Sequence, residues 1–512
     1  MISATGETID LPETAAGRKR RRRRRIGLII AVVVLVVGAG WAVNEVVRTC
    51  GSLGSQVYRI DGECVGVTDG SYVFDPAFEK VQQEIAQENT RVREDAAADG
   101  SSYVTVALLN LLTPTDNSAT PAEQIRSQLE GAYTAQRRIN EIHAADESLP
   151  QIQLVLANQG NTPDQWRPVA DQLAKMANLD NSDHLVAVIG LGVSTTGTQQ
   201  RARDLSARGI PMVGAIITAD GLDNNNVRGL IRVSPSNQDY VEALRGYVDT
   251  LNPRPSAMVV FDDNSDSSGD LFTKTLKEDL EQRMGDLINF PSQSFVGKSI
   301  PTGASSGKFK DVTNSICAVQ PDVVFYAGRE VDLDGFLQSL ADRPCREIKP
   351  LTVLTGGSDV SATLEQWEPR MPAAKLTAVF AATTYPEGWQ RGVAGTPGGY
   401  PEFLMAFQSH HGFDTRNLDD GGAIMMHDAL LTAAGAVERA ASGQSPPTAG
   451  DVRSQLLNLN GPVFQIRGAS GTLSFSSRNQ GEGDPIGKPI PVLEYPQPAS
   501  SPSRQVALYV TD

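Results

Sequence analysis

The chain has 512 residues, with 45 Lys and Arg against 60 Asp and Glu, a formal net charge of −15 and 40% hydrophobic residues. This is the composition of a globular protein, and the length predicts two to four domains, each large enough to bury its own core. Residues 1–48 carry a net charge of +5, whereas residues 49–512 hold 36 basic and 56 acidic groups, a net of −20. Because phosphates bind cationic surfaces, the acidic main body argues against a nucleic-acid partner.

A membrane anchor is expected near the N-terminus. The basic run Arg18–Arg25 is followed by an uncharged stretch, Ile26–Val43. As a helix this stretch is about 27 Å long, close to the ~30 Å hydrocarbon core of a bilayer. We therefore expect a single-pass anchor over residues 26–47 in the cell membrane, with the basic tail of residues 1–25 in the cytoplasm and the rest outside the cell. A cleaved signal peptide is the alternative, although the apolar run is longer than usual and no clean cleavage site follows it.

The four cysteines agree with export. They fall into two pairs along the chain, Cys50 with Cys64 and Cys317 with Cys345. An oxidising compartment favours both pairs as disulfides, each worth roughly 3 to 4 kcal/mol in the chain-entropy model. Four free buried thiols are the alternative, and a zinc site is disfavoured because no CxxC or His-Cys spacing is present.

Strands and helices are expected to alternate from Tyr103 onward. Residues 48–101 look like a juxtamembrane stalk with one helix, from about residue 75 to 95, that has only a thin apolar stripe. After it, apolar runs at 103–109, 152–157, 185–191 and 212–217 are separated by amphipathic segments. This order predicts a parallel sheet with helices on both faces.

Two helix starts are explicit in the sequence. Thr120-Pro-Ala-Glu123 and Thr162-Pro-Asp-Gln165 each place a hydroxyl before a proline, with Glu or Gln three residues after the hydroxyl. This spacing predicts N-caps at Thr120 and Thr162.

The same alternation restarts after Arg232 and predicts a second α/β lobe. Its expected strands lie at 258–261, 295, 323–326 and 351–354, and its helices at 271–284, 308–319 and 333–340. Beyond it we expect a strand at 376–381, helices at 401–410 and 421–441, and short β-like runs at 463–466, 472–475 and 490–493. The tail of residues 496–512 is rich in Pro and Ser at its start and is expected to be flexible.

Catalytic motifs fail on their spacing. The glycines at 190, 192 and 197 do not fit a dinucleotide fingerprint, and Gly192 to Gly197 is one residue too long for a nucleophile elbow. Gly303 to Lys308 is one residue short of a Walker loop, and the five histidines show no metal-ligand spacing. We therefore expect no enzyme activity, no cofactor and no metal.

Polar residues at the ends of predicted strands are the informative feature, because open α/β sheets bind ligands at the carboxyl ends of their strands. Each of these residues alone is better explained as a helix cap, but together, at strand ends of two lobes, they form a candidate ligand-binding set. The set comprises Ser194, Thr195, Thr218, Asp263, Arg329, Ser358 and Asp359.

The chain resembles the type I periplasmic-binding-protein family, the branched-chain amino-acid-binding kind of solute receptor of ABC transporters, over roughly residues 102–495. The resemblance is carried by the order of five motifs: Tyr103-Val-Thr-Val-Ala-Leu-Leu, Ala187-Val-Ile-Gly190, Gly209-Ile-Pro-Met-Val213, Arg232-Val-Ser-Pro-Ser236 and Gly468-Ala-Ser-Gly471. It implies a two-lobed α/β fold, each lobe a mostly parallel sheet flanked by helices. Lobe one would comprise 102–230 plus about 355–450, and lobe two 231–354 plus about 451–495.

The resemblance also implies ligand contacts. Ser194 and Thr218 match the family's hydroxyls for a ligand carboxylate, and Ser358-Asp359 falls where an acidic residue takes the ligand ammonium. The chain departs from the pattern at Arg329-Glu330 and Asp266 to Gly269, which replace aromatic residues, and at Asn158-Gln159, which replaces an acidic pair. These departures favour a small polar ligand, amino-acid-like or amide-bearing, over an aliphatic amino acid.

The expected function is a membrane-tethered extracellular solute-binding protein that holds its ligand between two lobes for an ABC permease. The alternative is a cell-envelope sensor or interaction module that reuses the fold without transport and passes its signal to a separate protein. An extracellular enzyme is the third hypothesis, disfavoured by the missing catalytic patterns.

Overall fold

The computed structural model describes residues 50–51, 55–115, 118–146, 148–162, 164–178, 181, 183–263, 269–297, 308–357, 360–410, 412–441, 446–477 and 481–512. The expected anchor at 26–47 lies outside these residues. Within them, no helix combines the length and the apolar character needed to cross a membrane. The chain divides into two compact units, residues 1–64 and residues 65–512. The first contains β1(Val57–Ile60) and the expected disulfide between Cys50 and Cys64.

Lobe one is built on a sheet whose strands in the second unit run in the order β2-β4-β3-β5-β6-β7. The strands from β3 to β7 are parallel, and β2 runs antiparallel to β4. Every residue of β4 and β5 is buried, as expected for strands covered by helices on both faces. The bounds are β2(Glu63–Thr68), β3(Tyr103–Asn110), β4(Gln151–Asn158), β5(Leu185–Gly190), β6(Met212–Gly214) and β7(Leu230–Arg232).

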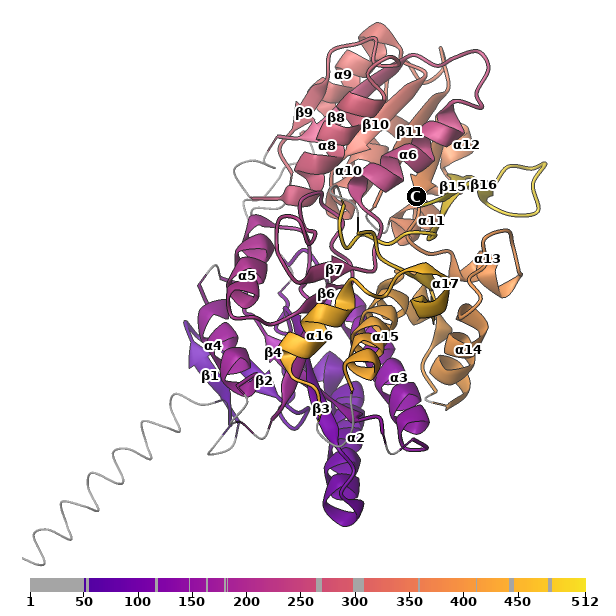
Figure 1. Ribbon diagram of the computed structural model, residues 1–512. Coiled ribbons are helices and arrows are strands. Elements are labelled where there is room, and N and C mark those ends of the chain that lie inside the picture. Colours follow the sequence, from indigo (N-terminus) through magenta and orange to yellow (C-terminus); the bar gives the residue numbers. More distant parts are fainter. Residues whose placement is uncertain are drawn as a thin grey trace, which may run out of the picture. The chain divides into compact units, whose positions relative to one another are not determined.

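Six helices flank this sheet: α2(Glu79–Asp99), α3(Ala122–His143), α4(Trp166–Met176), α5(Thr196–Ala207), α15(Gly422–Ala440) and α16(Ala449–Leu456). Helices α3 and α15 pack directly together (Figure 1). Gly131 permits this approach, because a Cβ there would lie 1.9 Å from the carbonyl oxygen of Ala423. The sequence prediction of an N-cap at Thr120 is wrong, since α3 begins after Pro121 with no side-chain cap.

The expected stalk helix is part of lobe one. A short 3-10 turn, η1(Pro76–Phe78), leads into α2, which packs against α3, β3 and β4. Its apolar stripe is fully buried at Val81, Ile85 and Val92. The interpretation of residues 75–95 as a stalk is therefore wrong, because even this narrow stripe packs against β3 and β4 of the sheet.

Lobe two is built on a second sheet in the order β16-β15-β12-β11-β10-β8-β9, with β8 to β12 parallel and β15 and β16 antiparallel. The strands are β8(Ala257–Asp262), β9(Gln293–Phe295), β10(Val323–Ala327), β11(Leu351–Gly356), β12(Leu376–Ala381), β15(Pro489–Tyr495) and β16(Gln505–Val510). The helices are α6(Asn237–Val248), α8(Leu271–Arg283), α9(Lys310–Val319), α10(Glu330–Ala341), α11(Ser361–Trp367) and α12(Met371–Ala374).

Both faces of the second sheet are buried, which explains its continuous apolar strands. In β10, Val324 and Tyr326 belong to the same apolar cluster as Phe336 of α10. The alternate residues Val323 and Phe325 belong to a separate cluster with residues of α6 and α8. This alternation is the period of two that a strand imposes.

Two lobe boundaries and the C-terminal tail differ from those expected. Residues from about 355 to 450 are expected in lobe one, yet β12 pairs with β11 and β15 in the second sheet. Residues from about 451 to 495 are expected in lobe two, yet α16 and β13(Ile466–Gly468) contact α15 of lobe one, and β14(Gly471–Leu473) pairs with β13. The expected flexible tail contains β16, which β15 holds in the sheet. Chain crossings between lobes leave no local signal in the sequence, so these boundaries are set by strand pairing.

The remaining short elements are α13(Pro386–Gln390), α14(Tyr400–Met405), the π-helical turn η2(Ala406–His410), η3(Thr415–Leu418) and α17(Gly461–Phe464). The last replaces the β-like run expected at 463–466. The second expected disulfide is present between Cys317 of α9 and Cys345, with an S–S distance of 2.07 Å.

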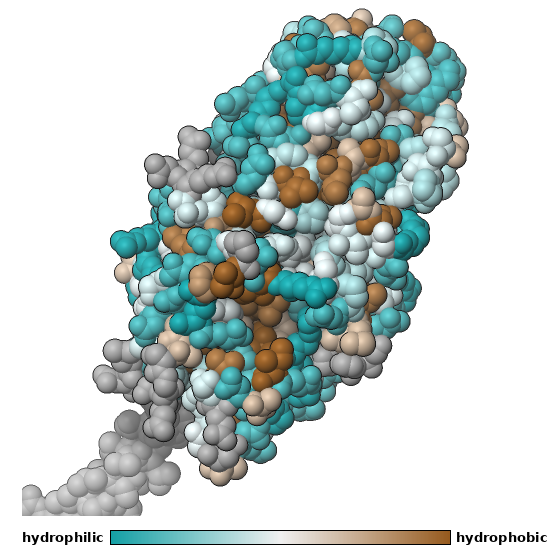
Figure 2. Space-filling view, turned by 45° about the vertical axis from the view of Figure 1, so that its right-hand side comes forward, coloured by the Kyte–Doolittle hydropathy of each residue, from teal (hydrophilic) through white to brown (hydrophobic). Residues whose placement is uncertain are grey.

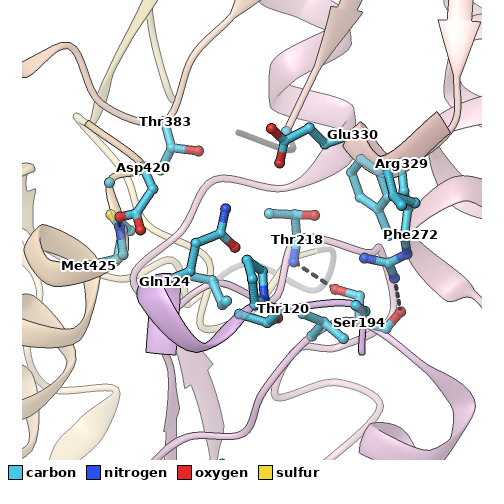
Figure 3. Close-up of a pocket in the computed structure, with 18 of the residues that line it drawn as sticks. Thr120, Gln124, Ser194, Thr218, Phe272, Arg329, Glu330, Thr383, Asp420 and Met425 are labelled. Atoms are coloured by element: carbon cyan, nitrogen blue, oxygen red, sulfur yellow. Dashed lines mark hydrogen bonds between the residues drawn. The ribbon is translucent and has the colours of Figure 1, made fainter. Parts of the chain in front are cut away.

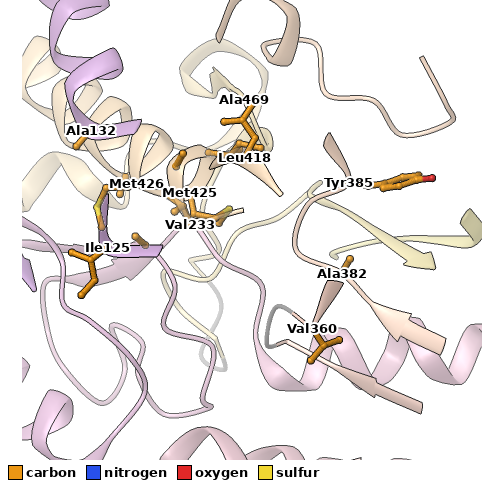
Figure 4. Close-up of a cluster of buried hydrophobic side chains, with 14 of the residues drawn as sticks. Ile125, Ala132, Val233, Val360, Ala382, Tyr385, Leu418, Met425, Met426 and Ala469 are labelled. Atoms are coloured by element: carbon orange, nitrogen blue, oxygen red, sulfur yellow. The ribbon is translucent and has the colours of Figure 1, made fainter. Parts of the chain in front are cut away.

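The chain passes between the lobes after β7, after β12 and before β15. Apolar residues of these crossings, Val233, Ala382 and Tyr385, belong to one cluster with Met425 and Leu418 (Figure 4). The two lobes therefore share one hydrophobic core at their junction. The face shown in Figure 2 is mostly hydrophilic, with hydrophobic residues gathered in patches near its middle.

Candidate functional site

A cavity of about 400 Å³ lies between the two lobes. This volume is within the ~300–1,000 Å³ typical of small-molecule sites. Lobe one, lobe two and the crossing segments all contribute to its wall (Figure 3). The polar side chains in this wall are Ser118, Thr120, Gln124, Gln128, Ser194, Thr218, Ser234, Arg329, Glu330, Asp334, Thr363, Thr383 and Asp420.

Ser194 connects the segments that follow β5 and β6 by hydrogen bonds at the wall of the cavity. It follows β5, is 2% exposed, and its Oγ accepts hydrogen bonds from the backbone N–H groups of Thr218 at 2.9 Å and Ala219 at 3.1 Å. A hydroxyl that accepts two such bonds still has its own proton to donate. Ser194 therefore fixes the position of Thr218 and keeps one donor for a bound molecule.

Arg329 enters the cavity from lobe two and is held by an internal carboxylate. Its Nε and Nη2 donate to the two carboxylate oxygens of Asp270 at 2.5 and 2.8 Å. The guanidinium also lies over the ring of Phe272, 5.3 Å from its centroid. Asp270 in turn caps α8 by accepting from the N–H of Thr273. This bidentate arrangement fixes the guanidinium plane.

The loop after β5 is hydrogen-bonded directly to lobe two. The N–H of Thr196 donates to the carbonyl of Gly269 at 2.8 Å, and the carbonyl of Ser194 accepts from the N–H of Phe272 at 3.3 Å. Nη2 of Arg329 also donates to the Ser194 carbonyl, at 3.3 Å (Figure 3). The lobes are thus in contact along one side of the cavity.

Acidic side chains line the cavity from both lobes. Glu330 begins α10 and its Oε1 accepts from the hydroxyl of Thr363 at 3.1 Å, while Asp334 accepts from the Trp367 indole N–H at 2.8 Å. Asp420 approaches from lobe one and accepts from the Ser127 hydroxyl at 2.8 Å and the Gly422 N–H at 2.7 Å. Neutral donors orient carboxylates without removing their charge.

Behind the crossing segment, Tyr240 forms a 2.6 Å hydrogen bond with the hydroxyl of Thr383. Burial raises the pKa of the Tyr240 phenol, which favours its protonated, neutral form. The hydrogen bond to Tyr240 holds the Thr383 side chain in place at the cavity wall.

The predicted site residues fall into three groups. Ser194, Thr218 and Arg329 all line the cavity. Thr195 instead caps α5 by accepting from the Thr198 N–H, and Asp263 is exposed and is not among the lining residues. Ser358 and Asp359 lie outside the described residues, although the preceding Gly357 lines the cavity.

Several lining residues were not found from the sequence. Thr120 and Gln124 come from the start of α3, and Asp420 comes from the turn before α15, almost 300 residues later. The Thr120 motif is a weak signal, because its spacing is also typical of a helix cap. Asp420 and Thr383 stand in no motif. The packing of α15 against α3 brings Asp420 to this wall, and the crossing segment after β12 brings Thr383.

No group of three metal-binding side chains occurs in the part of the chain that the structure describes. The lining residues likewise do not combine a nucleophile with a histidine base. They provide hydrogen-bond donors, acceptors and charges around an enclosed volume, as small-molecule binding sites do.

No protein-family model matches the sequence, and no curated protein matches it. Solved structures do match. An ABC transporter substrate-binding protein from Desulfitobacterium hafniense is 19% identical, with a TM-score of 0.54 over 80% of this chain and 100% of its own. A branched-chain amino acid transporter substrate-binding protein from Streptococcus pneumoniae, in complex with isoleucine, is 15% identical, with a TM-score of 0.52 over 80% of this chain and 99% of its own.

A third match is a solute-binding protein of an ABC transporter from Rhodopseudomonas palustris, in complex with p-hydroxybenzoic acid. It is 13% identical, with a TM-score of 0.52 over 80% of this chain and 98% of its own. These neighbours are substrate-binding proteins of transporters rather than enzymes. The two-lobed α/β architecture expected from the sequence is thus confirmed, and the chain has the fold of the type I periplasmic-binding proteins.

Proposed function

We propose that this protein is a non-enzymatic, membrane-tethered extracellular receptor that captures a small polar molecule between its two lobes for an ABC transporter. The observation that carries the proposal is the cavity itself, which both lobes and the crossing segments line. A ligand that contacts both lobes stabilises the closed form by its extra contacts, and a membrane partner can sense that closure.

The tethering part of the proposal comes from the basic run Arg18–Arg25 and the uncharged stretch that follows it. Protease added to intact cells is expected to digest the lobes and spare the arginine-rich tail. A mature N-terminus beyond Trp41 would instead mean a released protein.

Native mass spectrometry of the full chain, purified without denaturation, tests the binding function. A receptor is expected to retain a small molecule, and denaturation is expected to release it. A matched pair of variants then locates it. Thr218→Val removes a hydroxyl that lines the cavity, whereas Thr195→Val removes only the cap of α5.

We expect Thr218→Val to reduce the retained fraction and Thr195→Val to preserve it, at a stability cost of about 1 kcal/mol for the lost cap. Equal retention in both variants, with the fold intact by circular dichroism, would place the ligand elsewhere. Full-length protein that is consistently free of any small molecule and gains no thermal stability from a metabolite library would contradict the receptor function.

A second candidate is a ligand sensor that does not feed a transporter. It is favoured by the direct bonds from Thr196 to Gly269 and from Phe272 to Ser194, because contacts made by the chain itself hold the lobes together without a ligand. Deleting the gene separates the two candidates. A transport receptor is required for uptake of its retained ligand, whereas a sensor is not.

A further inference from the structure

The charge of the cavity wall indicates the kind of molecule that it holds. Three of the lining side chains are carboxylates, Glu330 and Asp334 from lobe two and Asp420 from lobe one. Among the described lining residues, Arg329 is the only cation. The wall therefore has an excess of negative charge before any ligand enters.

The one cation among the described lining residues, Arg329, already has a carboxylate partner inside the protein. Asp270 receives two hydrogen bonds from Arg329, and the two side chains are only 3% and 15% exposed. A buried, bidentate pair of this kind is neutral as a unit. The Asp270 carboxylate thus neutralises Arg329 and leaves little positive potential for an anionic ligand.

The carboxylates face the cavity from both lobes. Figure 3 shows Asp420 and Glu330 approaching it from different elements, with Thr383 and Gln124 near Asp420. Like charges on the two walls repel one another in a low-dielectric cleft, and a cation between them converts that repulsion into attraction toward both. Lobe closure would then depend on the charge of the ligand.

We propose, resting on the receptor function above, that the cleft takes an organic cation with N–H donors at both ends, such as a diamine or a guanidinium compound. One end meets Asp420 and Gln124 of lobe one, and the other meets Glu330 and Asp334 of lobe two. The apolar side chains of Ile216, Val331 and Met425 cover the carbon chain between them.

Isothermal titration calorimetry of the full chain, stripped of small molecules by dialysis, tests this assignment with four probes: putrescine, L-arginine, L-isoleucine and p-hydroxybenzoate. Putrescine or L-arginine is expected to bind at least about 10-fold more tightly than the other two, with an affinity that falls as salt is added. Preferential binding of isoleucine or p-hydroxybenzoate would overturn the cation assignment and leave the receptor function standing. Binding of none of the four would also overturn it, and the receptor function would then be decided separately by native mass spectrometry.

Charge-neutral variants test the named residues. Glu330→Gln and Asp420→Asn keep the side-chain shape and should each weaken binding of the cationic probe by about 10-fold or more. Asp342→Asn is the matched control, because Asp342 ends the same helix, α10, outside the cavity. It should leave the affinity within twofold. An equal effect of all three variants would mean that only the overall charge of the protein matters and would refute the assigned contacts.

Discussion

Arg232 and Asp484, 252 residues apart in the chain, form a bidentate ion pair at the junction of the two lobes. Nε and Nη2 of Arg232 donate to the two carboxylate oxygens of Asp484 at 2.7 and 2.9 Å. The remaining Nη1 donates to the carbonyl of Ala219 at 2.7 Å. Arg232 is the last residue of β7 and is 1% exposed, while Asp484 lies on the segment that leads into β15. The pair therefore ties two of the three crossing segments together.

We predict that Asp484→Ala lowers the free energy of unfolding by about 3–5 kcal/mol, because it leaves the Arg232 charge buried without a partner. Urea denaturation measures the change. Glu402→Ala is the control, since Glu402 pairs with Arg467 at 3.6 Å on the surface and such pairs contribute about 0–1 kcal/mol. If the two variants lose the same stability, the Arg232–Asp484 pair does not hold the junction.

The Cys317–Cys345 disulfide links α9 to the segment after α10, over a sequence separation of 28. Replacing both cysteines by Ser is expected to cost about 2–5 kcal/mol, since the cross-link restricts the unfolded chain. A non-reducing peptide map should show the link in the native protein. Adding reductant to the wild type should shift its urea midpoint toward that of the variant, and free alkylatable thiols in the native protein would contradict the pairing.

Asp279 of α8 makes stability depend on pH. Its carboxyl is 7% exposed, and burial together with the neighbouring Asp220 raises its pKa well above the usual range. The unfolded chain loses this proton near pH ~4, whereas the folded chain keeps it to higher pH. The stability that this proton provides is therefore complete at low pH and is lost as the pH rises through the folded pKa.

We expect Asp279→Asn to flatten the decline of the urea midpoint between about pH 5 and 9, because Asn keeps a donor toward Asp220 and does not titrate. Asp249→Asn, at the exposed end of α6, should keep the wild-type slope. Parallel profiles for wild type and Asp279→Asn would show that the proton is not shared in the folded state.

Hydrogen exchange tests the contact between the lobes. The amide protons of Thr196 and Phe272 should exchange slowly in ligand-free protein, because each is bonded across the lobes. Arg329→Met combined with Asp270→Asn removes the third bond between the lobes, from Arg329 to the Ser194 carbonyl, and the two changes together leave no buried charge unpaired. We expect both amides to exchange about 10-fold faster in this double variant.

Arg245→Met, a change on the surface of α6, serves as the control for that experiment and should leave these two amides unaffected. Fast exchange at Thr196 and Phe272 in the wild type would mean that the lobes separate readily without a ligand.

Much of the fold could be predicted from local pattern. The apolar run at 376–381 coincides with β12, and the runs at 103–109, 152–157 and 323–326 each match an observed strand to within one residue at either end. Such runs are decisive because strands buried on both faces must be continuously apolar. The disulfide pairs could also be predicted, since four cysteines in two well-separated pairs leave few alternatives.

By itself, the sequence determined the alternation of strands and helices, the two-lobed architecture and the presence of Ser194 and Thr218 at strand ends beside the cavity. These follow from short-range rules of periodicity and strand polarity. Tertiary structure alone decided that α2 covers the first sheet and that β16 joins the second. It also decided that Asp420 and Glu330 line the same cavity. It likewise decided that Asp270 accepts hydrogen bonds from Nε and Nη2 of Arg329. Each of these depends on which distant segments pack together, because the free energy of burying a charge or an apolar stripe is set by its neighbours in space and not by those along the chain.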